Sequence, residues 1–257
     1  MSFRYIAVCV LLVLSLSACA PTELNSRDTE GRQTPASVNT QLGIEYMRNG
    51  MYEASLDVLK KAIKQNASYQ PAQVAIAVLY ERLGEIGLAE KHYRRAYNLN
   101  PKDALTLNNY GQFLCHTKHY DEADRMFNTA LEDPLYSHPE TVLTNAGLCA
   151  IRQARQDKAE KYLRRALERN PKYPPALREM ARLSFVREHW LAARAYLQRL
   201  QEVGSLTPEF LWIGVRTERA LGDRHALSSY ELLLKNRYPE SEETGKLLDW
   251  ERTQSGR

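Results

Sequence analysis

Small and large side chains recur along the chain in columns about 34 residues apart. The first column holds small residues, at Gly43, Ala77, Gly111, Gly147, Ala181 and Gly214. Twelve residues later a second small column holds Ser55, Ala89, Ala123, Ala159, Ala193 and Ala226. Four residues further on stand large apolar residues, Leu59, Tyr93, Phe127, Leu163, Leu197 and Tyr230. The columns stay in register over six periods, so the pattern predicts six copies of one structural unit.

Each period predicts a pair of antiparallel helices. Where two helices cross closely only a small side chain fits, which explains the glycine and alanine columns. The large residue four positions after the second small one lies on the same helix face and fills the space between neighbouring units. Pro101 and Pro171 follow second helices and end them. One unit cannot bury its apolar face alone, so we expect the six to stack into a continuous core.

The order of these positions resembles the tetratricopeptide repeat, a helix-turn-helix unit of 34 residues. The resemblance implies an all-α fold, a right-handed superhelix of about six repeats over residues 37–239. The polar residues 240–257 after the repeats are predicted to form a C-terminal tail, in which Leu247, Leu248 and Trp250 could form a final turn.

The N-terminus predicts a targeting segment. Arg4 precedes an apolar stretch from Ile6 to Leu16, which is too short to cross a bilayer as a helix. Leu16-Ser17-Ala18-Cys19 follows and resembles a bacterial lipobox. The resemblance implies a signal peptide over residues 1–18, cleavage after Ala18 and acylation of Cys19. The alternative is an ordinary secretory signal with an incidental cysteine.

The residues after Cys19 bear on localisation. Ala20 stands where an aspartate commonly retains such lipoproteins at the inner membrane, so the resemblance implies a lipid anchor in the outer membrane, facing the periplasm. Residues 19–36 are polar and lack a helical period, so we expect a flexible tether.

Charge and motifs narrow the function classes. The net charge of +4 on 257 residues argues against a dedicated nucleic-acid binder. Basic pairs such as Lys60-Lys61 and Arg94-Arg95 fit a solvated convex face better than an anion patch. The chain has no H-E-x-x-H, G-x-S-x-G or P-loop motif, so we expect no catalytic residues, no cofactor and no small-molecule substrate.

Cys115, His116 and His119 are the best candidates for a metal site, but a fourth ligand has no candidate, and we predict none. Cys115 and Cys149 fall in the first helices of adjacent repeats, which pack side by side. We predict a disulfide between them, because disulfides persist in an oxidising compartment. The alternative is a pair of buried free thiols.

The first helices line the inner surface of such a stack, where a partner groove is expected. When the repeats are counted from Ala36, Gln70, Ala104, Glu140, Pro174 and Thr207, the fifth, ninth, twelfth and thirteenth positions of each repeat should face it. In repeats one and two these positions place exposed apolar side chains at Ile44, Met47, Val74 and Val78. The alternatives are that an N-terminal segment covers this patch, or that the assignment of the face is off by one position.

Three stretches resemble one known family. They begin at Leu107, Asn145 and Phe210 and read LNNYGQFLC, NAGLC and FLWIG. Together with the lipobox they are similar to the pilotin lipoproteins of type IV pili, the PilF/PilW family. The resemblance implies a non-enzymatic adaptor that binds secretin subunits and promotes their outer-membrane localisation and multimerisation, in pilus biogenesis and twitching motility. Rival hypotheses are a lipoprotein scaffold for cell-wall synthesis enzymes and a periplasmic enzyme.

Overall fold

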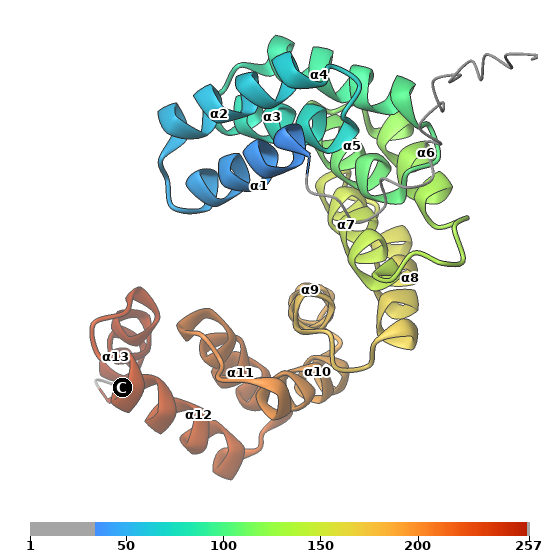
Figure 1. The fold of residues 1–257 in the computed structure, drawn as a ribbon. Coiled ribbons are helices and arrows are strands. Elements are labelled where there is room, and N and C mark those ends of the chain that lie inside the picture. The colour runs from blue at the N-terminus through green and yellow to red at the C-terminus, as the bar shows by residue number, and fades with distance from the viewer. Residues whose placement is uncertain (1–33, 256–257) are drawn as a thin grey trace, which may run out of the picture. The chain divides into compact units, whose positions relative to one another are not determined.

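The computed structural model describes residues 34–255 and shows six helix pairs followed by one further helix (Figure 1). The first helices of the pairs are α1 (Pro35–Arg48), α3 (Gln70–Arg82), α5 (Ala104–His116), α7 (Pro139–Arg152), α9 (Pro174–Val186) and α11 (Pro208–Leu221). The second helices are α2 (Tyr52–Gln65), α4 (Ile86–Leu99), α6 (Tyr120–Ala130), α8 (Gln156–Arg169), α10 (Trp190–Val203) and α12 (Arg224–Arg237). The last helix is α13 (Glu242–Ser255), and residues 34–255 contain no strand.

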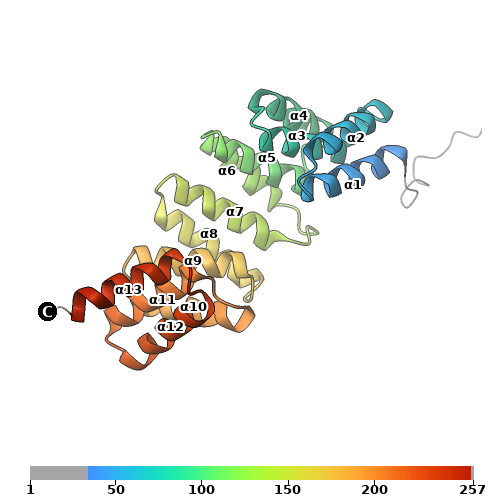
Figure 2. The same ribbon diagram turned by 90° about the vertical axis from the view of Figure 1, so that its left-hand side faces the viewer.

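Each pair packs against the next one along the chain, so the pairs stack in sequence order (Figure 2). The first helices also contact one another, α1 with α3 and so on to α9 with α11. In Figure 1 these first helices lie on the inner side of the curved stack. The sequence prediction of six stacked helix pairs is confirmed.

The first small column marks places where a helix backbone meets a large side chain. A Cβ added at Gly111 would lie 2.8 Å from Phe127 Cε1, and one at Gly214 would lie 2.7 Å from Tyr230 Cδ1. Real Cβ atoms do not approach carbon so closely, because interiors are packed at van der Waals distance. Glycine at these positions therefore lets the two helices of one repeat cross closely.

Aromatic rings fill the junction between the second and third repeats. Tyr93 of α4 stacks on Tyr110 of α5 with ring centroids 5.6 Å apart, and lies 5.0 Å from the ring of Phe113. All three side chains are buried. Such ring pairs stabilise a junction through their large apolar area and their offset geometry.

Ion pairs add to the apolar packing at the junction between the fifth and sixth repeats, where Phe210 of α11 is also buried. Arg194 of α10 binds both carboxylate oxygens of Glu218 on α11, and Glu218 is only 1% exposed. Arg182 of α9 binds Glu209 of α11, with its Nη2 2.7 Å from Oε2. Each guanidinium therefore joins one repeat to the next.

The C-terminal residues differ from the prediction. Residues 242–255 form helix α13 and not a polar tail, with Leu247 fully buried and Trp250 packed against the core. These two residues are three positions apart, so they share one helix face, and α13 contacts α11 and α12. Helix α13 thus covers the end of the stack, where the last repeat would otherwise expose its apolar face.

The expected signal peptide, Cys19 and most of the tether lie outside the described residues. The tether was predicted to run to residue 36, whereas α1 begins at Pro35. Among residues 34–255, no helix combines the length and the apolar composition that a bilayer span requires.

Candidate partner-binding groove

Helices α1, α3 and α5 together form an open groove of about 420 Å³. The four residues predicted from the sequence, Ile44, Met47, Val74 and Val78, all line it. Met47 lies three residues after Ile44 on α1, and Val78 lies four after Val74 on α3, so each pair shares a helix face. The spacing of apolar residues therefore placed these side chains on the same surface.

Burial divides the four residues into two kinds. Met47 and Val74 are 5% and 8% exposed, whereas Ile44 and Val78 are partly exposed. The expectation that all four are exposed is wrong for Met47 and Val74, because the inner helices pack closely enough to cover them. Met47 and Val74 form the floor of the groove, and a charge placed at either would disturb the core.

Sequence reasoning missed Leu105, which is 54% exposed and lines the same groove from α5. Leu105 is the second residue of its repeat, and Pro71 occupies the same position in the preceding repeat and also lines the groove. Only the fifth, ninth, twelfth and thirteenth positions were considered. Including the second position would have identified both residues.

A polar cavity of about 450 Å³ continues the groove beyond Val78. Its carboxylate is Glu81, which lies 2.6 Å from His116 Nδ1 and accepts a hydrogen bond of 3.1 Å from the Tyr93 hydroxyl. Burial, followed by the nearby charge of Glu81, raises the pKa of Tyr93. The hydroxyl therefore stays protonated and donates, and it holds Glu81 in place.

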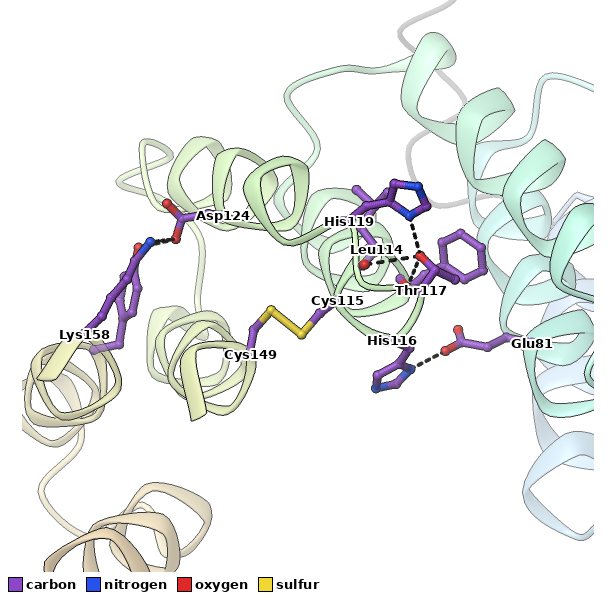
Figure 3. The surroundings of a disulfide bond; sticks show 11 residues. Glu81, Leu114, Cys115, His116, Thr117, His119, Asp124, Cys149 and Lys158 are labelled. Carbon is purple, nitrogen blue, oxygen red and sulfur yellow. Dashed lines mark hydrogen bonds and ion pairs between the residues drawn. A yellow bond between two sulfur atoms is a disulfide. The ribbon is translucent and has the colours of Figure 1, made fainter. Parts of the chain in front are cut away.

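A disulfide joins Cys115 of α5 to Cys149 of α7, with the Cα atoms 5.8 Å apart (Figure 3). The structure thus contains the predicted disulfide and not the alternative pair of free thiols. The two histidines considered with Cys115 point to different partners, since His116 faces Glu81 and His119 Nδ1 lies 3.0 Å from Thr117 Oγ1 (Figure 3). Within residues 34–255 no cluster of three metal-ligating side chains occurs.

Comparisons with known proteins agree with this architecture. Two tetratricopeptide repeat models match residues 40–104 and 102–172. The type IV pilus assembly protein PilF of Pseudomonas aeruginosa is 32% identical over 237 residues, which cover 91% of this chain and 94% of that protein. The chain belongs to the PilF/PilW family.

Solved structures of this family have the same fold. A structure of Pseudomonas aeruginosa PilF matches with a TM-score of 0.73 and 31% identity, over 84% of this chain and 97% of that one. A structure of PilW, described as a widely conserved type IV pilus biogenesis factor, matches with a TM-score of 0.76 and 32% identity, over 84% of this chain and all (100%) of that one. The predicted all-α tetratricopeptide superhelix is confirmed, and the chain is a repeat protein of pilus assembly.

Proposed function

We propose that this protein is a pilotin, a lipid-anchored adaptor that binds subunits of the type IV pilus secretin. In this role it promotes their localisation to the outer membrane and their multimerisation. The proposal is supported by membership of the PilF/PilW family, by the lipobox at Leu16–Cys19 and by an apolar groove suited to a peptide segment. We also propose that the role is purely one of binding, without catalysis.

The groove of repeats one to three is the observation on which the proposal depends most. Its rim of Ile44, Val78 and Leu105 offers apolar area to a partner, and its floor is already packed. Covering about 400 Å² of apolar surface would contribute about 10 kcal/mol at the usual coefficient. Association costs at least about 4 kcal/mol, which leaves about 6 kcal/mol or less and an affinity of tens of micromolar or weaker.

The test is binding of purified secretin to rim variants of the whole chain. Ile44→Glu and Leu105→Glu should each weaken binding about tenfold or more, because a charge on an apolar rim must be desolvated on binding. Leu232→Glu is the matched control, since Leu232 is 59% exposed on α12, at the other end of the stack. Circular dichroism should be unchanged for all three variants.

Unchanged secretin binding by both rim variants would contradict the groove. Secretin that assembles fully in the outer membrane of cells lacking this protein would contradict the pilotin role. Recovery of a cell-wall synthase in place of secretin would favour the scaffold hypothesis.

The anchor needs a separate test. Cys19→Ser removes the proposed acyl acceptor, so the protein should leave the membrane fraction and secretin assembly should fall or occur at the wrong membrane. An outer-membrane protein that resists washing despite this change would contradict the lipobox interpretation.

A further inference from the structure

The inner helices of repeats four to six carry more positive than negative charge. Their five arginines are Arg152, Arg178, Arg182, Arg216 and Arg219, and their four carboxylates are Glu140, Glu179, Glu209 and Glu218. The excess of unpaired arginines over unpaired carboxylates is larger than these numbers indicate, because one arginine binds two of the carboxylates. Arg182 alone binds both Glu179 and Glu209.

The other two carboxylates are also occupied. Glu218 is bound by Arg194 of α10, and Glu140 lies 3.5 Å from His138. As a result four arginines on these helices have no carboxylate within 4.0 Å in the part of the chain that the structure describes. They are Arg152, Arg178, Arg216 and Arg219.

Apolar side chains lie among these arginines. The Arg216 guanidinium lies 4.7 Å from the ring centroid of Phe185, and Phe185 packs edge-on against Trp190 at 5.5 Å. Val186 follows Phe185 and is 63% exposed. Phe185 and Arg216 occupy the repeat positions that Cys115 and Cys149 occupy between repeats three and four, so this contact joins α9 to α11 on the inner side.

We infer that the arginine face, defined as Arg152, Arg178, Arg216 and Arg219 with Phe185 and Val186, is a second docking surface. Its occupant is an acidic peptide segment of a partner protein that also carries an apolar side chain. Guanidinium groups bind carboxylates in bidentate fashion, and arginine beside exposed apolar and aromatic groups is typical of interface hot spots.

Charge complementarity selects this occupant. The groove of repeats one to three is mainly apolar, although Arg48, Arg82 and Asp103 also line it, and the carboxylate of its extension, Glu81, is already paired with His116. The arginine face is more basic, because none of its four arginines has a carboxylate within 4.0 Å in residues 34–255, and Arg219 instead lies over the ring of Trp250, 4.0 Å from its centroid. Its residues lie on inner helices of a curved stack, where an extended chain fits better than a flat lipid surface (Figure 1). The inference does not depend on the proposed function.

The experiment measures fluorescence anisotropy of a labelled peptide of four Glu-Glu-Phe repeats with the purified whole chain. The peptide should bind, and affinity should fall when the ionic strength rises from about 0.05 M to about 0.5 M. Arg152→Glu combined with Arg216→Glu should weaken binding about tenfold or more, by loss and reversal of two contacts. Val186→Ser should weaken it about threefold, through lost apolar contact.

Arg95→Glu combined with Arg169→Glu is the matched control. These arginines are exposed on α4 and α8 and the double change alters the net charge equally, so binding should stay within about twofold. Leu105→Glu in the other groove should also leave peptide binding unchanged, which separates this inference from the proposed function. Circular dichroism checks that each variant is folded.

Four outcomes would overturn the inference. Equal loss in the control would mean non-specific attraction, and loss in Leu105→Glu would place the peptide in the other groove. Equal binding of a Lys-Lys-Phe peptide would exclude charge recognition. Absence of peptide binding combined with arginine-dependent binding to phosphatidylethanolamine–phosphatidylglycerol vesicles, or with arginine-dependent self-association, would assign the face to lipid or to a second copy.

Discussion

Two junctions of the same stack add different interactions to a shared apolar packing. Between repeats two and three, the rings of Tyr93, Tyr110 and Phe113 pack together away from water. Between repeats five and six, Arg194 binds Glu218 and Arg182 binds Glu209. Backbone geometry repeats in both places, so the repeat requires a filled junction and not one particular chemistry.

The inner surfaces next to these two junctions also differ. Apolar packing is non-directional, and the neighbouring groove at Ile44 and Val78 is lined mainly by apolar side chains. Ion pairing is directional, and Arg182 takes two carboxylates while Arg178, one turn away, has none within 4.0 Å among the described residues. The two regions of the stack therefore present different surfaces, a mainly apolar groove and a face with unpaired arginines.

The largest expected loss of stability is at the junction of repeats two and three, where the aromatic rings pack. Phe113→Ala should lower the free energy of unfolding by about 4 kcal/mol, because it leaves a cavity in a core where Phe113 is 1% exposed. Urea unfolding followed by circular dichroism measures the change. Leu248→Ala, at a side chain 39% exposed on α13, should cost less than about 0.5 kcal/mol. A loss at Phe113 as small as the loss at Leu248 would mean that the rings do not stabilise the stack.

Loss of the disulfide, which joins repeats three and four, should cause the second largest loss of stability. Replacing Cys115 and Cys149 together by serine opens a loop with a sequence separation of 34 residues. The chain-entropy relation gives a loss of about 3 to 4 kcal/mol for a loop of that size. Treating the unmodified protein with reductant should lower its urea midpoint to a similar extent. Two alkylated thiols in unreduced protein, measured by mass, would contradict the bond.

Breaking the ion pair of Arg194 and Glu218, between repeats five and six, should cause the third largest loss of stability. Arg194→Ala leaves the Glu218 carboxylate buried without its partner, and breaking such a pair costs about 3 kcal/mol, reduced to about 2 because Arg194 is partly exposed. Adding Glu218→Gln should recover part of this loss, since the buried charge disappears. If the double variant is as unstable as the single one, the cost of burying an unpaired charge is not the cause of the loss.

The smallest expected effect is the pH dependence of the stability contributed by the ion pair of Arg182 and Glu209. The hydrogen bond from Arg182, followed by its charge, holds the pKa of Glu209 below its ordinary value of 4.5. The stabilisation is therefore complete above the pKa of unfolded glutamate and is lost as pH falls through the lower pKa of the folded protein. Glu209→Gln should cost less than about 1 kcal/mol at pH 7, because the pair is partly exposed. The difference from unmodified protein, measured by urea unfolding, should shrink below about pH 4. If this difference in stability grew on acidification, the pKa of Glu209 would be raised by folding and not lowered.

Much of the fold could be predicted from the sequence, because the constraint behind it is local. A small residue is needed where the two helices of a repeat cross, as at Gly111 against the ring of Phe127, and the column of small residues recurs once per repeat. Ile44 and Val78 were placed in the groove for a similar reason, since helical spacing alone determines which side chains share a face.

The tertiary structure decided the rest. The sequence suggested only a final turn at Leu247, Leu248 and Trp250, whereas the mostly polar segment 242–255 forms the whole of helix α13 by packing on α11 and α12. Met47 is buried because α3 covers it, although its position in the repeat predicted exposure. The arginine face depends on which arginine reaches a carboxylate on another helix. That outcome depends on distances between helices, because the energy of a charge pair falls with separation and not with position in the sequence.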